Sequence, residues 1–177
     1  MSKNTSNRDK KFFELARQAA EKSDFPQKMG CVVVYRNQVI SEGYNQKRTH
    51  PMQIKYDAYR PEIIEGVRNV HSMHAESSAL FKIMDMDICW RKVEIYVYRI
   101  MKCKPFGLAK PCPSCTALIR DLGIKKVHYT SNDNSYITEE WIWLLHTLLR
   151  SVTIFLRPCD RSFFLLIFPH ICAIIDV

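Results

Sequence analysis

The sequence predicts an α/β domain, because segments with the apolar periodicity of helices alternate with short runs rich in β-branched and aromatic residues. Two such runs, 30–35 and 39–44, flank a polar turn and predict a β-hairpin. Further strands are expected at 93–98 and 124–130, each after a helical segment. This alternation packs helices against a sheet and so defines the fold class.

The helices and the end of the chain complete the expected order of elements. An amphipathic helix is expected at 9–22, and a second begins near His74. A third helix follows Pro113, since proline favours the first helical turn. The chain is expected to continue with a helix at 136–150 and a fifth strand at 152–156. The order strand, helix, strand predicts a parallel pair at the sheet edge.

Cys112 and Cys115 are candidate metal ligands, together with His74 upstream. The two thiols stand three positions apart at the start of an expected helix, where backbone amides and the helix dipole favour thiolate over thiol. Zinc takes thiolate and neutral imidazole, and a hydrolytic zinc site holds three protein ligands with a fourth position left for water. The three residues therefore predict one zinc ion per chain.

Glu76 is the candidate catalytic proton shuttle, two residues past the histidine at the same helix start. A carboxylate there can face a zinc-bound water without binding the metal and can move the proton that zinc makes acidic. Two other interpretations stay open. The cysteine pair alone also fits a redox dithiol, and the metal set also fits a structural zinc site with Cys103, His71 or His128 as a fourth ligand.

Length and composition favour one domain with an apolar tail. The chain has 177 residues and 47% hydrophobic content, which supports a domain at 1–156, and the mostly apolar tail is placed at 157–177. A transmembrane helix needs about 20 apolar residues, and the tail is too interrupted for that, so no membrane association is expected. The tail covers the sheet, forms the interface of a homo-oligomer, or is an aberrant end of the reading frame.

Charge and cysteine usage indicate the kind of partner and the compartment. The net charge of +8 suits an anionic partner, either a nucleotide or a nucleic acid, and is equally common as a solubility feature. The first residues are polar and basic with no apolar run behind them, so no secretory signal and a cytoplasmic location are expected. The 7 cysteines, an odd number, are expected to be reduced.

Two basic segments flank the candidate metal ligands. Segment 46–70 shows no helix or strand pattern and is expected to be an irregular insertion beside the site entrance. His50 and His71 fall in or next to this insertion, and a second metal between them is an alternative to two solvated histidines. Segment 99–110 is a basic loop before the cysteines that either touches a phosphate or is solvated.

A histidine followed two residues later by glutamate, with a Pro-Cys-x-x-Cys motif downstream, is typical of zinc-dependent nucleobase deaminases. With these motifs, segment 11–130 resembles the cytidine and deoxycytidylate deaminase superfamily. The resemblance implies a three-layer α/β/α sandwich with a five-stranded mixed sheet, and zinc ligands and a proton shuttle at the residues named above. It also implies that Asn45, after the second strand, contacts the sugar or base of the substrate; the alternative is an ordinary turn asparagine. Ala75 either leaves space for the flat base or is simply a good helix former.

Within the superfamily, segment 123–129 looks most like the deoxycytidylate deaminases, as would a parallel pair of final strands. The chain departs from that branch at Ser77 and Ser78, where those enzymes have an asparagine, and at Gln46, where the regulated enzymes have glycine. The expected function is hydrolytic deamination of cytosine in a deoxycytidylate- or cytidylate-like nucleotide, with release of ammonia. The alternatives are a polynucleotide deaminase acting on cytosine in single-stranded DNA or RNA or on adenosine in tRNA, and a zinc-stabilised binding protein without turnover.

Overall fold

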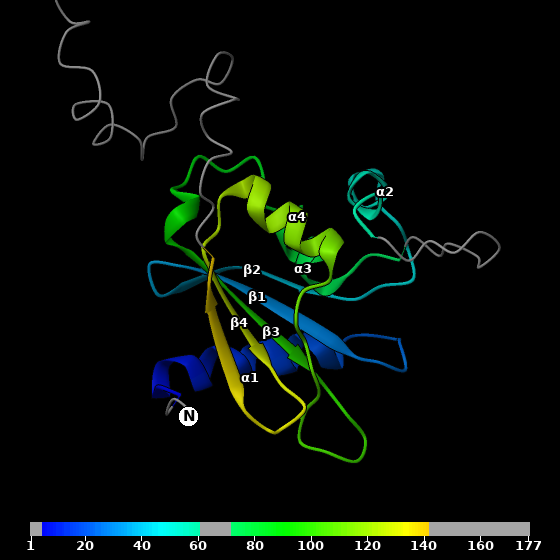
Figure 1. The fold of residues 1–177 in the computed structure, drawn as a ribbon, viewed down its shortest axis with the longest axis vertical. Coiled ribbons are helices and arrows are strands. Elements are labelled where there is room, and N and C mark those ends of the chain that lie inside the picture. Colours follow the sequence, from blue (N-terminus) through cyan, green and yellow to red (C-terminus); the bar gives the residue numbers. More distant parts are fainter. Residues whose placement is uncertain (1–4, 61–71, 142–177) are drawn as a thin grey trace, which may run out of the picture. The chain divides into compact units, whose positions relative to one another are not determined.

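The fold was analysed in a computed structural model, which describes residues 5–60 and 72–141 (Figure 1). The chain divides into two compact units, and nearly all described residues belong to the first. Of the second unit only 86–89 is described, a short turn in which the amide of Ile88 donates to the carbonyl of Met86 at 3.0 Å. The expected domain boundary at 156 lies outside the described residues and stays a prediction.

A five-stranded mixed sheet forms the centre of the first unit. Its strands are β1 (Met29–Tyr35), β2 (Gln38–Tyr44), β3 (Val93–Arg99), β4 (Lys126–Thr130) and β5 (Tyr136–Glu140). They lie in the order β2-β1-β3-β4-β5, and only β3 and β4 run parallel to each other. The hairpin and the strands expected near residues 93 and 124 are confirmed.

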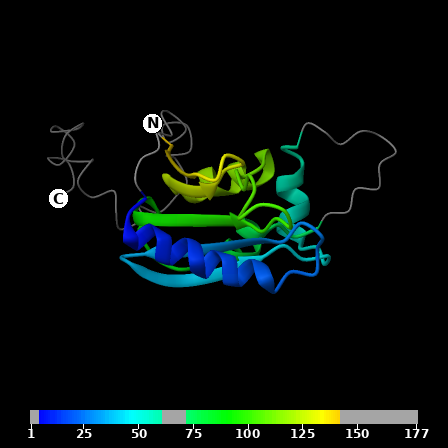
Figure 2. The ribbon, with the colours of Figure 1, turned by 90° about the horizontal axis from the view of Figure 1, so that it is seen from below.

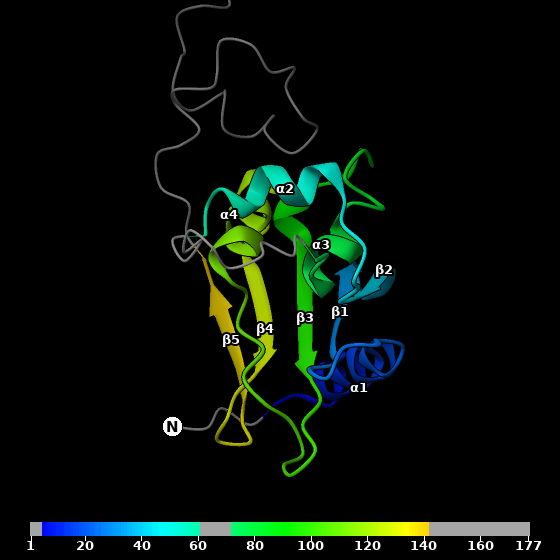
Figure 3. The same cartoon turned by 90° about the vertical axis from the view of Figure 1, so that its right-hand side faces the viewer.

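Helices cover both faces of this sheet, as the resemblance implied. Helix α1 (Asn7–Glu21) packs on one face, and α3 (Ala75–Leu80) and α4 (Pro113–Leu122) cover the other (Figure 2). Helix α2 (Pro51–Asp57) lies beside α4 (Figure 3), and a short 3₁₀ turn (Trp90–Lys92) precedes β3. The three-layer α/β/α arrangement with a mixed sheet is confirmed.

The apolar periodicity of α1 accounts for the part of the core that lies between this helix and the sheet. Its inward face carries Phe12, Phe13 and Ala16, which join side chains from β1 and β3 in one buried cluster. Tyr96 of β3 is fully buried there, with its ring 5.1 Å from that of Phe12. Strand β1 is buried along its length because helices cover both of its faces, which is why its sequence is a continuous apolar run.

The prediction of a helix at 136–150 is wrong for its first five residues. They form β5, which pairs antiparallel with β4 in a register that joins Thr130 to Tyr136 and Lys126 to Glu140. A tight polar turn makes this hairpin: Asn134 has a φ of 59°, and the amide of Ser131 donates to the carbonyl of Ser135 at 3.0 Å. The last described pair of strands is therefore antiparallel, and strand direction no longer supports the deoxycytidylate branch. The strand expected at 152–156 lies outside the described residues.

The segment expected to be irregular contains helix α2. Pro51 occupies its first turn, and His50 caps it by accepting a hydrogen bond at Nδ1 from the amide of Met52 at 3.2 Å. Cys89 is disulfide-bonded, so the expectation of reduced cysteines is wrong for this residue. Within 5–60 and 72–141, no helix has the length and apolar character needed to cross a membrane.

Candidate active site

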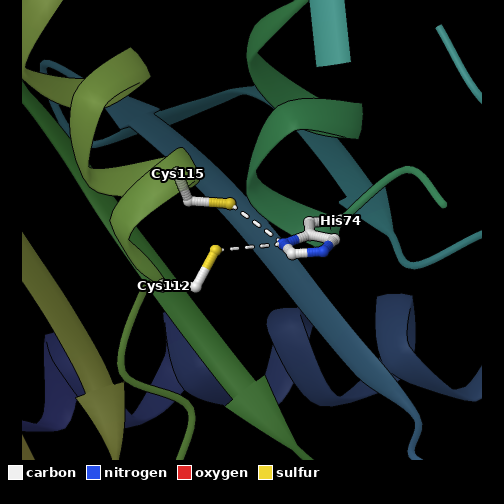
Figure 4. A group of neighbouring side chains, drawn as sticks. All are labelled: His74, Cys112 and Cys115. Atoms are coloured by element: carbon white, nitrogen blue, oxygen red, sulfur yellow. Dashed lines mark hydrogen bonds between the residues drawn. The ribbon is translucent and has the colours of Figure 1, made fainter. Parts of the chain in front are cut away.

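Three side chains that could hold a metal ion meet where α3 and α4 begin (Figure 4). His74 is the residue before α3, Cys112 is the residue before α4, and Cys115 lies in the first turn of α4. Their ligand atoms all lie within 4.8 Å of one another. The fold thus brings together the three residues that the sequence motif predicted as metal ligands.

A proline and a long-range β-bridge position the starts of the two helices. Pro113 occupies the first turn of α4, so that helix starts directly after Cys112. Met73, just before His74, forms an isolated β-bridge with Gln46, with hydrogen bonds of 2.9 and 3.1 Å between the two backbones. This bridge ties the approach to His74 to the chain that leaves β2.

The spacing of the donor atoms fits a tetrahedral zinc site. Nδ1 of His74 lies 3.3 Å from Sγ of Cys112 and 3.4 Å from Sγ of Cys115. Zinc–sulfur bonds of about 2.3 Å and zinc–nitrogen bonds of about 2.05 Å at the tetrahedral angle place nitrogen and sulfur about 3.6 Å apart. The observed distances differ from this by a few tenths of an ångström. One imidazole and two thiols are also the donor types that zinc prefers.

The electrostatics of the cluster favour a thiolate at Cys112. The hydrogen bond from Cys115 lowers the pKa of Cys112 to about 4, and the neighbouring His74 acts in the same direction against the effect of burial. The same bond, together with burial, raises the pKa of Cys115. Burial alone would lower the pKa of His74, but its bond to Cys112 and the charge of Glu76 reverse this, so the pKa is raised.

Glu76 lies in the first turn of α3, two residues after the histidine, and is 2% exposed. Burial raises the pKa of its carboxyl group, and the nearby charge of Cys112 raises it further. A hydrogen bond with Cys115 acts in the opposite direction, so the carboxyl group lies against the cysteine pair. A carboxyl group with a raised pKa beside a cluster that could hold a metal ion suits the transfer of protons.

The residues considered as a fourth ligand are placed elsewhere. Cys103 is exposed in the loop after β3. His128 lies in β4, where its Nδ1 is 2.8 Å from the hydroxyl of Thr138. His50 caps α2 and stacks on Phe81, and His71 lies outside the described residues. In the part of the chain that the structure describes, the group that could hold a metal therefore consists of three residues.

Asn45 and Ala75, the two expected substrate contacts, have distinct surroundings. The amide oxygen of Asn45 accepts from the backbone of Met29 at 2.9 Å, and its amide nitrogen donates to the carbonyl of Gln27 at 2.8 Å. The side chain thereby holds the loop that enters β1. Ala75 is 1% exposed at the start of α3. Its carbonyl faces Gly43 of β2, where an added Cβ would lie only 2.5 Å from that oxygen.

Sequence reasoning missed a group of buried polar residues beside the cluster. Gln53 and Asp57 of α2 are 0% and 2% exposed and contact Ser77 and Ser114 in the first turns of α3 and α4. Both α2 residues lie in a segment rich in basic and polar residues, a composition typical of a solvated surface. The available signal was their spacing of four residues after a proline, which puts both on one side of a helix.

The family described as "Cytidine and deoxycytidylate deaminase zinc-binding region" matches residues 6–131. An uncharacterized deaminase from the luxG 3' region of Aliivibrio fischeri is 27% identical over 131 residues, which cover 73% of this chain and 76% of that protein.

Two solved structures show the same fold. The deoxycytidylate (dCMP) deaminase of the cyanophage S-TIM5, in its apo form, is 21% identical with a TM-score of 0.50, covering 72% of this chain and 86% of that one. A cytidine deaminase from Burkholderia pseudomallei is 20% identical with a TM-score of 0.51, covering 77% of this chain and 93% of that one.

Proposed function

Because this chain belongs to the cytidine and deoxycytidylate deaminase family, we propose that it is a zinc-dependent enzyme that deaminates the cytosine base of a nucleotide. The observation that carries this proposal is the meeting of His74, Cys112 and Cys115 beside the buried carboxyl group of Glu76. The reaction consumes water, forms a C4–O bond, breaks the C4–N bond and yields a uracil base and ammonia. It belongs to the hydrolytic class that acts on C–N bonds of cyclic amidines.

His74, Cys112 and Cys115 would hold one zinc ion per chain. The ion would supply Lewis acidity that lowers the pKa of a water molecule to about 7. Two thiolates and a neutral imidazole balance the charge of Zn²⁺, so the protein ligands add no net charge to the site. The N-terminal turn of α4 supports Cys112 in the thiolate form that such binding requires.

Glu76 would move the protons of the reaction. Its carboxylate accepts a proton from the attacking water and passes it to the ring nitrogen N3 of cytosine. It then delivers the second proton to the amino group that leaves C4. Burial supports this role, because a carboxyl group with a raised pKa exchanges a proton with less cost than a solvated one.

Asn45 and Ala75 are proposed to contact the substrate. An amide nitrogen carries two hydrogens, and that of Asn45 donates one to the carbonyl of Gln27. The other can be donated to the sugar or the base. Ala75 stands between His74 and Glu76 in sequence, and its small side chain limits the bulk beside the base.

A free nucleotide such as deoxycytidylate or cytidylate is the proposed substrate. The net charge of +8 supports an anionic substrate, and the solved S-TIM5 protein of the same fold is named for its action on deoxycytidylate. The second candidate is cytosine in single-stranded DNA or RNA, or adenosine in tRNA. It is favoured by the basic residues Lys47, Arg48, Lys55 and Lys110 in the segments that flank the ligands.

The decisive experiment is a measurement of ammonia release by the purified full chain. Cytosine, cytidine, cytidylate, deoxycytidylate, adenosine, tRNA and single-stranded DNA are compared at equal base concentration. The proposal expects the highest kcat/KM with a free pyrimidine nucleotide. Turnover confined to polynucleotides would establish the second candidate, and zinc binding without turnover on any member would indicate a binding protein.

A further inference from the structure

The proposed reaction gives no role to the buried polar cluster between α2, α3 and α4. It consists of Gln53, Asp57, Ser77 and Ser114, none of them more than 2% exposed. Burial of an amide and a carboxylate is costly unless each is hydrogen-bonded. When all of its hydrogen bonds are made, a buried polar cluster of this kind holds the surrounding elements in one arrangement.

The hydrogen bonds of this cluster converge on Gln53. Its amide nitrogen donates to Asp57 Oδ1 at 2.7 Å and lies 3.2 Å from the hydroxyl of Ser114. Its amide oxygen accepts a bond from the hydroxyl of Ser77. Ser114 also donates to Asp57 Oδ1 at 3.1 Å, and Arg60 places a guanidinium nitrogen 4.0 Å from the same oxygen. The amide of Gln53 can make all three bonds because its nitrogen carries two hydrogens to donate and its oxygen accepts.

The two serines connect the cluster to the candidate metal ligands. Ser77 follows His74 by three residues, and its hydroxyl lies 3.3 Å from the carbonyl oxygen of His74. Ser114 stands between Cys112 and Cys115 in the first turn of α4. Gln53 therefore joins the helix start that carries the histidine to the helix start that carries both cysteines.

This connection bears on the distance between His74 and the two cysteines, on which metal binding depends. Zinc tolerates only small departures from bonds of about 2.3 Å to sulfur and about 2.05 Å to nitrogen. His74 and the cysteines belong to different helices, so their spacing depends on how the starts of α3 and α4 are held relative to each other. Residues that hold metal ligands from behind change metal affinity by about 10- to 100-fold when they are removed.

We propose that Gln53, with Ser77, Ser114 and Asp57, forms a set of positioning residues that fixes the spacing between His74 and the cysteine pair. The proposal rests on the proposed zinc site and adds a task for α2. This helix tunes how tightly the metal is held, although it contributes none of the three ligands. The four polar residues thereby link the starts of α3 and α4, where the ligands lie.

The test compares metal binding by the full-length apoprotein and two variants, Gln53→Met and Ser114→Ala. Met keeps the length of Gln but loses all polar contacts, and Ser114→Ala removes a single hydroxyl. Zinc affinity is measured by competition with a chromogenic chelator. Cobalt(II) serves as a second probe, because its thiolate charge-transfer and d–d absorption bands report the geometry of the ligands. We expect zinc to bind about 10- to 100-fold more weakly in both variants, with altered cobalt bands.

Two matched controls separate positioning from general stability. Ser41→Ala also removes a buried hydroxyl, one that donates to the carbonyl of Ala79 near the end of α3 at 2.7 Å. It should lower the Tm but leave zinc affinity and the cobalt spectrum unchanged. Gln18→Leu changes an exposed glutamine on α1 and should alter neither.

The outcomes distinguish this proposal from the one it rests on. If Ser114→Ala and Gln53→Met bind zinc as tightly as Ser41→Ala, with the same cobalt bands, the positioning role is wrong while the zinc site stands. If Gln53→Met does not fold, Ser114→Ala alone decides. If the unmodified chain binds neither zinc nor cobalt, the proposed function fails, and this inference fails with it.

Discussion

The proposed role of Glu76 concerns the transfer of protons and not the binding of zinc, so a substitution here can separate the two. In Glu76→Gln the amide keeps the shape of the side chain but accepts no proton at neutral pH. We therefore expect zinc content to stay near one per chain while kcat falls by about 10³-fold or more. Metal analysis and ammonia release on the same sample check this.

The control for this variant is Glu42→Gln, in an exposed ion pair with Lys22, which should leave activity unchanged. Turnover at the normal rate in Glu76→Gln would remove Glu76 from the proposed mechanism.

The two cysteines are proposed to bind zinc and, through the bound metal, to stabilise the fold. In Cys115→Ser the oxygen is a poorer zinc ligand than a thiolate, so we expect loss of most bound zinc. The stability that metal binding adds to the folded chain is lost with it, and the Tm should fall to that of the metal-free protein. Cys31→Ala is the control, because Cys31 is fully buried in β1 and outside the cluster. That variant should lose stability and keep its zinc; zinc retained by Cys115→Ser would contradict the ligand assignment.

At the scale of elements, α3 sits directly on β2 because Gly43 has no side chain. A Cβ at this position would lie 2.4 Å from the amide nitrogen of Ala79 and 2.5 Å from the carbonyl oxygen of Ala75. Both contacts are to backbone, so α3 would have to move as a whole. Since His74 starts that helix, the fit of β2 against α3 also sets where the histidine lies.

Gly43→Ala should therefore destabilise the protein by about 1–3 kcal/mol and weaken zinc binding as well. Urea unfolding and zinc competition measure the two effects. Gly107→Ala is the matched control, because the nearest atoms to its Cβ would belong to side chains, Met101 Cγ at 2.8 Å, Met101 Sδ at 2.9 Å and Arg99 Cδ at 3.3 Å. Equal effects of the two substitutions would show that contact with the α3 backbone is not what matters.

Elements with local signals could be predicted from the sequence, and those that depend on distant packing could not. Proline after Cys112 fixes the start of α4, so the motif predicted where the cysteines lie. Segment 136–140 begins with Tyr-Ile-Thr after a polar turn, which is a hairpin signal, but the apolar spacing further along favoured a helix. Helix α2 was missed because Gln53 and Asp57 look like surface residues until the serines of two other helices are placed against them.

At the scale of the whole described unit, a charged network on the α1 side of the sheet joins α1, β3 and β4. Glu94 Oε2 lies 2.9 Å from Arg8 Nη1, 3.1 Å from the hydroxyl of Tyr96 and 3.3 Å from His128 Nε2. His128 and Arg8 hold the pKa of Glu94 at about 2, below its ordinary value of 4.5, although burial acts in the opposite direction.

This shift predicts a pH dependence of stability. A carboxyl group whose pKa is depressed in the folded state stabilises the fold above its unfolded pKa, near 4.5, and the stabilisation is lost as the pH falls through about 2. Glu94→Gln should thus cost up to about 3 kcal/mol at pH 7 and progressively less between pH 4.5 and 2. Unfolding by urea at several pH values, with Glu42→Gln as the exposed control, checks this. A cost that does not change with pH would contradict the assignment.

The antiparallel direction of β5 decides at which end of the sheet the backbone of Trp141 lies. Ala109, shortly before the cysteines, donates to the carbonyl of Thr130 at the carboxyl end of β4, whereas the amide of Trp141 donates to the carbonyl of Lys125 just before that strand begins. The indole of Trp141 nevertheless donates to Glu139 Oε2 at 2.8 Å, and Lys110, two residues before Cys112, donates to Oε1 of the same carboxylate at 2.7 Å. Because one carboxylate joins this indole to the segment before the cysteines, its fluorescence should respond both to unfolding of the sheet and to a ligand that displaces Lys110.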